Sequence, residues 1–152
     1  MFQALHRFLT GLAPDEHAVD HSDPAFALAV LLIEVARSDD RIDARENSAI
    51  ARVLARRFGL ARDEVSRLIE AAEESAINAT DLFRFTQVVV DNFDENERIG
   101  VIEMLWEVAQ SDGVLTGDED TLIRRVAGLI YVTDFERGEA KRRVRERLAG
   151  NG

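Results

Sequence analysis

Carboxylates gather in two short segments of the chain, at a spacing that suits the binding of a divalent cation. Residues 39–46 read DDRIDARE and residues 112–119 read DGVLTGDE, and we call these segments the acidic loops. Both match the second half of an EF-hand loop, which supplies calcium with carboxylate and carbonyl oxygens and ends in a glutamate. The candidate metal ligands are therefore Asp39, Asp43, Glu46, Asp112 and Glu119.

The acidic loops also have a purely structural interpretation. The first half of an EF-hand loop is missing, because Val35 and Val108 stand where its first ligand would be. Glu46 and Glu119 each follow a capping residue by three positions, which is the spacing of a capping box at a helix start. Aspartates that follow directly after a helix, such as Asp39, are unfavourable by roughly 0.3–1 kcal/mol each. A cation or a basic side chain would remove that conflict, so both interpretations stay open.

The acidic loops belong to a longer internal repeat. Residues 32–53 and residues 105–126 are identical at ten of 22 positions when they are shifted by 73. Each copy predicts a helix, a short acidic loop and a second helix. A unit that occurs twice indicates a duplicated domain with an internal pseudo-twofold rather than a solenoid.

The elements that carry these loops predict an all-α bundle of seven to eight helices. Apolar residues recur at helical spacing, and no sustained alternation indicates a strand. We expect an amphipathic leader helix and a polar linker in residues 1–22, a helical domain in residues 23–148 and a tail in residues 149–152. Gly59 should end one helix, and the predicted N-caps are Asp23, Asp43, Thr80, Asp94, Thr116 and Thr133.

Composition excludes several classes of function. A net charge of −10 over 152 residues disfavours nucleic-acid binding, which needs Lys and Arg to neutralise phosphates. The chain has no cysteine, and its three histidines (His6, His17 and His21) precede the predicted domain, so thiolate and Ser-His-Asp chemistry are not expected there. We therefore expect no catalytic residues and no small-molecule substrate. No secretory signal is apparent, and the longest apolar run, residues 25–33, is too short to span a bilayer, which predicts a cytoplasmic location.

The doubled pattern resembles a known family. Residues 34–46 and 107–119 share E-V-A-x-S-D-x-x-[IL]-x-x-x-E, with an apolar helix before and after each copy. This pattern is similar to that of the tellurite-resistance B (TerB) family, over about residues 23–148. The resemblance implies a small helical cytoplasmic domain of stress-response systems, associated with metal ions and with membrane-bound partners, and not an enzyme. The family's acidic positions correspond to Asp39, Glu46, Asp112 and Glu119, and Asp40 stands where the family usually has Gly.

Three other features allow alternative interpretations. Glu34 and Glu107 interrupt apolar helices, either at an exposed helix edge, in a buried hydrogen bond, or as further ligands one turn before the acidic loops. The basic C-terminal segment, residues 137–147, is either a solvated helix or a docking face on an acidic protein. The leader either folds back onto the domain or docks elsewhere.

The sequence thus predicts a non-enzymatic module of metal, tellurite or envelope stress response. It would bind a divalent cation such as Ca²⁺, or a basic partner, at the acidic loops. The alternative is a helical scaffold that docks to a membrane-associated protein partner through its N-terminal helix, with the acidic loops serving only as helix caps.

Overall fold

The described part of the chain is helical throughout its regular structure, which confirms the predicted all-α bundle. The computed structural model describes residues 23–37, 44–78, 82–111 and 116–150. The helices in these ranges are α2 (Pro24–Ala36), α3 (Ala44–Phe58), α4 (Arg62–Asn78), α5 (Leu82–Asn92), α6 (Glu95–Ala109), α7 (Gly117–Leu129) and α8 (Asp134–Gly150). The predicted leader helix lies outside the described residues, and the pseudo-twofold stays a prediction. None of the described helices is both long and apolar enough to cross a membrane.

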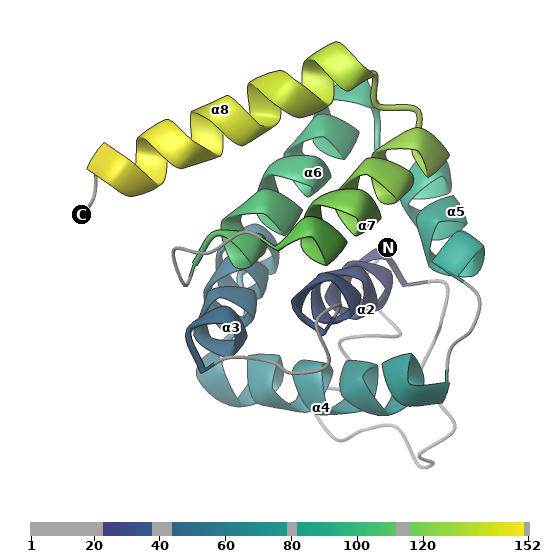
Figure 1. The fold of residues 1–152 in the computed structure, drawn as a ribbon. Coiled ribbons are helices and arrows are strands. Elements are labelled where there is room, and N and C mark those ends of the chain that lie inside the picture. Colours follow the sequence, from purple (N-terminus) through teal and green to yellow (C-terminus); the bar gives the residue numbers. More distant parts are fainter. Residues whose placement is uncertain (1–22, 38–43, 79–81, 112–115, 151–152) are drawn as a thin grey trace.

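Helix α2 is the centre of the bundle. It begins as predicted, with the Asp23 carboxylate accepting from the Ala25 N–H at 2.9 Å and Pro24 in the first turn. Its sequence, PAFALAVLLIEVA, has no polar face, and every residue in it except Glu34 is buried. A helix that is apolar all round needs neighbours on all sides. Helices α3, α4, α5, α6 and α7 supply them (Figure 1).

The surrounding helices are amphipathic or carry local start and stop signals. Helix α3 turns Ala49, Ile50, Val53 and Leu54 inward at helical spacing. It ends at Gly59, as predicted, where a φ of 64° allows the Leu60 N–H to donate to the Ala55 carbonyl at 3.2 Å. In Figure 1, α4 runs along one end of the bundle and α8 crosses the opposite end.

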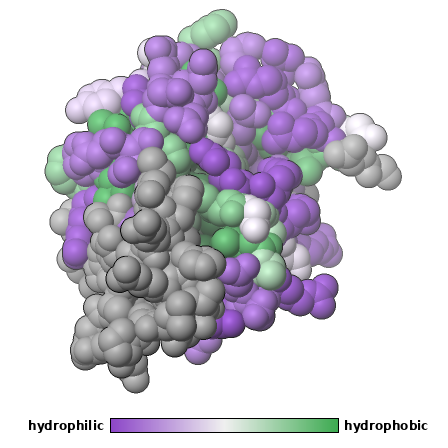
Figure 2. Space-filling view, turned by 180° about the vertical axis from the view of Figure 1, so that it is seen from behind, coloured by the Kyte–Doolittle hydropathy of each residue, from purple (hydrophilic) through white to green (hydrophobic). Residues whose placement is uncertain are grey.

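Helix α8 packs mainly on α6 and is held partly by polar contacts. Ala140 and Val144 are its buried residues. The Lys141 ammonium lies 4.8 Å from the centre of the Trp106 ring, within the range of a cation–π contact. Charged side chains cover most of the outer surface of these helices, and the face seen in Figure 2 is hydrophilic over most of its described area.

Candidate functional site

The two motif glutamates occupy equivalent positions at the starts of their helices. Glu46 is the third residue of α3, and Glu119 is the third residue of α7. Both are only 1% exposed, although glutamate is almost never fully buried without a partner. The positive end of the helix dipole favours a carboxylate in this turn. The sequence pattern therefore places two buried carboxyl groups at corresponding helix N-termini.

Glu119 completes the capping box that the sequence predicts. Its Oε1 accepts from the Thr116 N–H at 3.0 Å and from the Thr116 hydroxyl at 3.2 Å, while its own N–H donates to Thr116 Oγ1 at 3.1 Å. Its second oxygen, Oε2, is buried and has no hydrogen-bond partner within the described residues. The cap thus accounts for one carboxylate oxygen and leaves the other without a described partner.

Two other glutamates of the chain make the same cap at the surface. Glu97 completes a capping box with Asp94 at the start of α6, and its side chain is 44% exposed. Glu136 accepts from the Thr133 N–H at 2.9 Å at the start of α8, and these hydrogen bonds to Thr133 hold the pKa of Glu136 below its usual value. The predicted caps at Asp94, Thr116 and Thr133 are confirmed. Capping therefore does not require burial, and the burial of Glu46 and Glu119 needs another explanation.

The remaining predicted ligands are not part of the described structure. Asp39, Asp43 and Asp112 lie outside the described residues, as does the predicted cap Thr80. Within the described ranges, no group of three or more His, Cys, Asp or Glu side chains is close enough to hold a metal ion. The structure thus brings Glu46 and Glu119 to corresponding buried positions, and the complete metal site stays a prediction.

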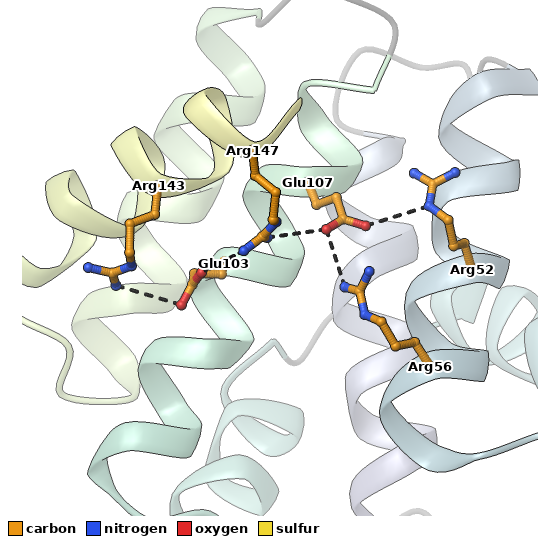
Figure 3. A network of polar contacts seen from close by, with 6 residues as sticks. All are labelled: Arg52, Arg56, Glu103, Glu107, Arg143 and Arg147. Carbon is orange, nitrogen blue, oxygen red and sulfur yellow. Dashed lines mark hydrogen bonds and ion pairs between the residues drawn. The ribbon is translucent and has the colours of Figure 1, made fainter. Parts of the chain in front are cut away.

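Glu107 is surrounded by arginines from two other helices (Figure 3). Its Oε1 accepts from Arg56 Nη2 at 3.2 Å and from Arg147 Nη2 at 3.3 Å, and its Oε2 lies 3.7 Å from Arg52 Nε. Glu107 itself is 3% exposed. Among the sequence interpretations, the structure therefore supports the buried hydrogen bond. The carboxylate joins α3, α6 and α8 instead of adding to the acidic loops.

A second glutamate extends this network along α6. Glu103 lies one turn before Glu107, 3.3 Å from Arg147 Nη1 and 3.6 Å from Arg143 Nη2. Arg147 therefore spans both carboxylates with its two terminal nitrogens. We call Arg52, Arg56, Glu103, Glu107, Arg143 and Arg147 the arginine network. Sequence reasoning missed it, although each of its three helices contributes a pair of like charges four positions apart.

Glu34, the sequence equivalent of Glu107, has a different environment. It is partly buried on α2, and this burial raises the pKa of its carboxyl while the charge of Arg37 lowers it less. The two repeat copies thus use the same residue type differently. Glu107 is buried and forms ion pairs with three arginines. Glu34 is partly buried, which disfavours its charged form, and it has only the charge of Arg37 nearby to offset this.

A groove opens beside the arginine network between the start of α3 and the ends of α6 and α8. Its volume is about 560 Å³. Its lining is rich in hydrogen-bond donors and comprises Ala44, Arg45, Ser48, Arg52, Gln110, Ser111 and Leu148. Arg52 belongs to both the groove and the network, so the two features form one continuous surface.

The fold and these sites define a small all-helical module with buried glutamates at the starts of α3 and α7. Comparison with known families identifies it further, because residues 25–142 match the tellurite resistance protein TerB family. The chain belongs to the TerB family, and this membership implies a role related to tellurite resistance. Proteins of this family are generally not catalytic. Comparison with curated proteins and with solved structures gave no match.

Proposed function

We propose that this chain is a non-catalytic TerB module that binds a divalent cation at its paired acidic loops, in a role related to tellurite resistance. The observation that carries the proposal is the burial of the motif glutamates. Four glutamates of the chain stand three positions after a capping residue, and the two in the repeat are 1% exposed while Glu97 is 44% exposed. Capping alone does not explain this difference.

The second carboxylate oxygen of Glu119 is an atom that could ligate such an ion. A buried polar atom without a hydrogen-bond partner costs roughly 1–3 kcal/mol, and more when it carries charge. Oε2 of Glu119 is such an atom within the described residues. A cation beside it would offset that cost, and carboxylate oxygens are the ligands that Ca²⁺ and Mg²⁺ prefer. The acidic residues Asp39, Asp43 and Asp112 would supply further oxygens of the same kind.

A thermal melt in the presence of added cations tests the proposal. For a site with a Kd near 100 μM, 10 mM cation should stabilise the fold by roughly 2.7 kcal/mol. Calcium, magnesium and manganese should be compared, each followed by chelation. A melting temperature that none of the three ions changes would contradict the proposal and leave the glutamates as caps.

A pair of matched variants separates ligation from capping. Glu119→Gln keeps an oxygen that can accept from the Thr116 amide, because Gln also serves in a capping box, but it removes the charge that a cation needs. Glu97→Gln makes the same change in the exposed cap of α6. We expect Glu119→Gln to weaken cation-dependent stabilisation and Glu97→Gln to leave it unchanged. Equal effects of the two variants would show that Glu119 is not a ligand.

A further inference from the structure

The arginine network carries more positive than negative charge on a strongly acidic protein. Four guanidinium groups face the two carboxylates of Glu103 and Glu107, while the whole chain has a net charge of −10. The cations stay in contact with water, since the side chains of Arg52, Arg56, Arg143 and Arg147 are 54%, 57%, 42% and 44% exposed. The network is therefore an exposed basic patch around the buried Glu107 and the partly buried Glu103.

Much of the hydrogen-bonding capacity of these arginines is not used within the described residues. A guanidinium has five N–H donors. Arg52 approaches Glu107 through Nε, Arg56 through Nη2, and Arg143 approaches Glu103 through Nη2. Glu107 pairs with Arg52 and Arg56 through one nitrogen of each (Figure 3), and the other N–H donors of these two exposed side chains have no hydrogen bond or ion pair among the described residues. Side chains ordered in advance lose less entropy on binding a ligand.

The adjoining groove adds a concave surface to this basic patch. Its lining adds a second arginine, Arg45, to Arg52, and places the polar side chains of Ser48, Gln110 and Ser111 beside them. A volume of about 560 Å³ is much larger than a single small anion needs and lies within the range of sites that hold an extended ligand. Leu148 gives it one apolar wall.

We propose that this groove, with the arginine network beside it, is the docking site for an acidic peptide segment of a protein partner. Carboxylates of the segment would pair with Arg45, Arg52 and Arg56, and its backbone would meet the hydroxyl and amide groups of the groove. Arginine pairs with carboxylates through two parallel hydrogen bonds, which favours such a ligand. The groove borders the acidic loops, because Ala44 and Arg45 belong to the first of them, but peptide binding there requires no bound cation.

The same surface suits a nucleic acid or a membrane less well. Nucleic acids need an extended track of cations, and a net charge of −10 repels a long polyanion. Membrane surfaces are bound by helices that place large apolar side chains beside basic ones. The exposed large apolar side chains of the described residues are Phe83, Tyr131 and Phe135, and none of them lines the groove.

The test measures binding of a fluorescein-labelled glutamate-rich decapeptide to the full chain by fluorescence anisotropy at low salt. Ser48→Glu adds a negative charge to the groove at an exposed helix position without removing an arginine contact. Ser66→Glu makes the same change on the exposed side of α4 and is the matched control. We expect Ser48→Glu to weaken peptide binding about tenfold, as like charges in an interface do, and Ser66→Glu to change it less than about twofold.

A second pair of variants removes a charge instead of adding one. Arg52→Gln takes away a side chain that lies 3.7 Å from Glu107, and Arg124→Gln removes an arginine of similar exposure that pairs with Asp120 at 3.4 Å. Peptide affinity should fall several-fold in the first variant and stay within about twofold in the second. Circular dichroism of all four variants should be measured as the control that each is folded.

Amide chemical shifts locate the bound peptide. Peptide-induced shifts should concentrate on the amides of Ser48, Ser111 and Leu148. Shifts spread over α4 and α5, or equal affinities across both matched pairs, would overturn the proposal. Single-stranded DNA, phosphatidylserine vesicles and inorganic phosphate serve as competing probes under the same conditions. If one of these bound more tightly than the peptide and lost its binding in Ser48→Glu, the acidic-peptide assignment would be wrong.

Discussion

Glu107 and Arg56 lie 51 positions apart in the chain, and their side chains meet at 3.2 Å between Oε1 and Nη2 across the contact of α6 with α3. The Glu107 side chain is 3% exposed, while the Arg56 side chain is 57% exposed. One end of the interaction is therefore buried and the other is hydrated. This asymmetry means that the two partners should contribute unequally to stability.

Replacing Glu107 should cost more than replacing Arg56. Glu107→Gln leaves three arginines facing a neutral group at the junction of α3, α6 and α8, and we expect it to lower the free energy of unfolding by about 1–2 kcal/mol. Arg56→Gln leaves Glu107 with two arginines and removes an exposed cation, so its cost should stay below about 1 kcal/mol. Urea unfolding of the two variants gives the comparison. Equal midpoints in the two variants would contradict this difference, and midpoints equal to that of the parent chain would show that the network does not stabilise the packing of the helices.

Local signals made the helix starts predictable, whereas the arginine network was not predictable. The caps of α6, α7 and α8 each involve residues three positions apart, so they can be predicted from the sequence alone. Arg56 and Arg147 reach Glu107 from 51 and 40 positions away. Such contacts depend on how helices pack. The like-charge pairs along α3, α6 and α8 showed that each helix has a charged face, without showing which faces meet.

The central position of α2 could be predicted only in part, for a related reason. A helix without a polar face must be buried, and α2 is buried on all sides except at Glu34. Its neighbours could not be named from its sequence, since an apolar helix fits any apolar face. At the acidic loops, the carboxylates could be recognised from the sequence alone, whereas the burial of Glu46 and Glu119 is known only from the structure.

Leu31→Ala tests the central position of α2. Leu31 is fully buried, and a helix packed on all sides has little freedom to close a cavity. We expect a loss of about 2–5 kcal/mol in the free energy of unfolding. Leu122→Ala on α7 removes a side chain that is only partly buried and should cost clearly less. Similar losses of unfolding free energy in the two variants would mean that the helices around α2 move inward and fill the cavity.

Glu34→Gln should stabilise the protein at neutral pH and not at acidic pH. Burial raises the pKa of Glu34 above its usual value of 4.5, and Arg37 offsets this only in part. Between the unfolded pKa and the raised folded pKa, the native state binds more protons, so stability falls as pH rises through that window. Above the window the penalty is constant, and below it the penalty is absent.

The amide of the Glu34→Gln variant has no such titration. Its melting temperature should therefore exceed that of the parent chain at pH 7, and the difference should shrink as the pH falls toward 4. Glu70→Gln, at an exposed position on α4, is the control for loss of a negative charge. A difference that is the same at both pH values would rule out burial of the charge as the cause.

Tyr131→Gly should stabilise the end of α7 because Tyr131 occupies a backbone conformation that glycine adopts without strain. Its φ is 63°, and the Val132 N–H donates to the Ala127 carbonyl at 2.9 Å, the bond pattern that also closes α3 around Gly59. A residue with a Cβ pays roughly 1–2 kcal/mol in this region, while glycine loses more entropy on folding, so the net gain should be about 0.5–1 kcal/mol. The ring contributes little packing, since Tyr131 is 71% exposed.

Two further variants are the controls. Tyr131→Ala removes the ring and keeps the Cβ, so it should give no gain in stability. Gly59→Ala introduces a Cβ at a positive φ and should lower the free energy of unfolding by about 1 kcal/mol. Urea unfolding of the three variants decides the matter. A gain in Tyr131→Ala equal to that in Tyr131→Gly would place the cost in the exposed ring instead of in the backbone.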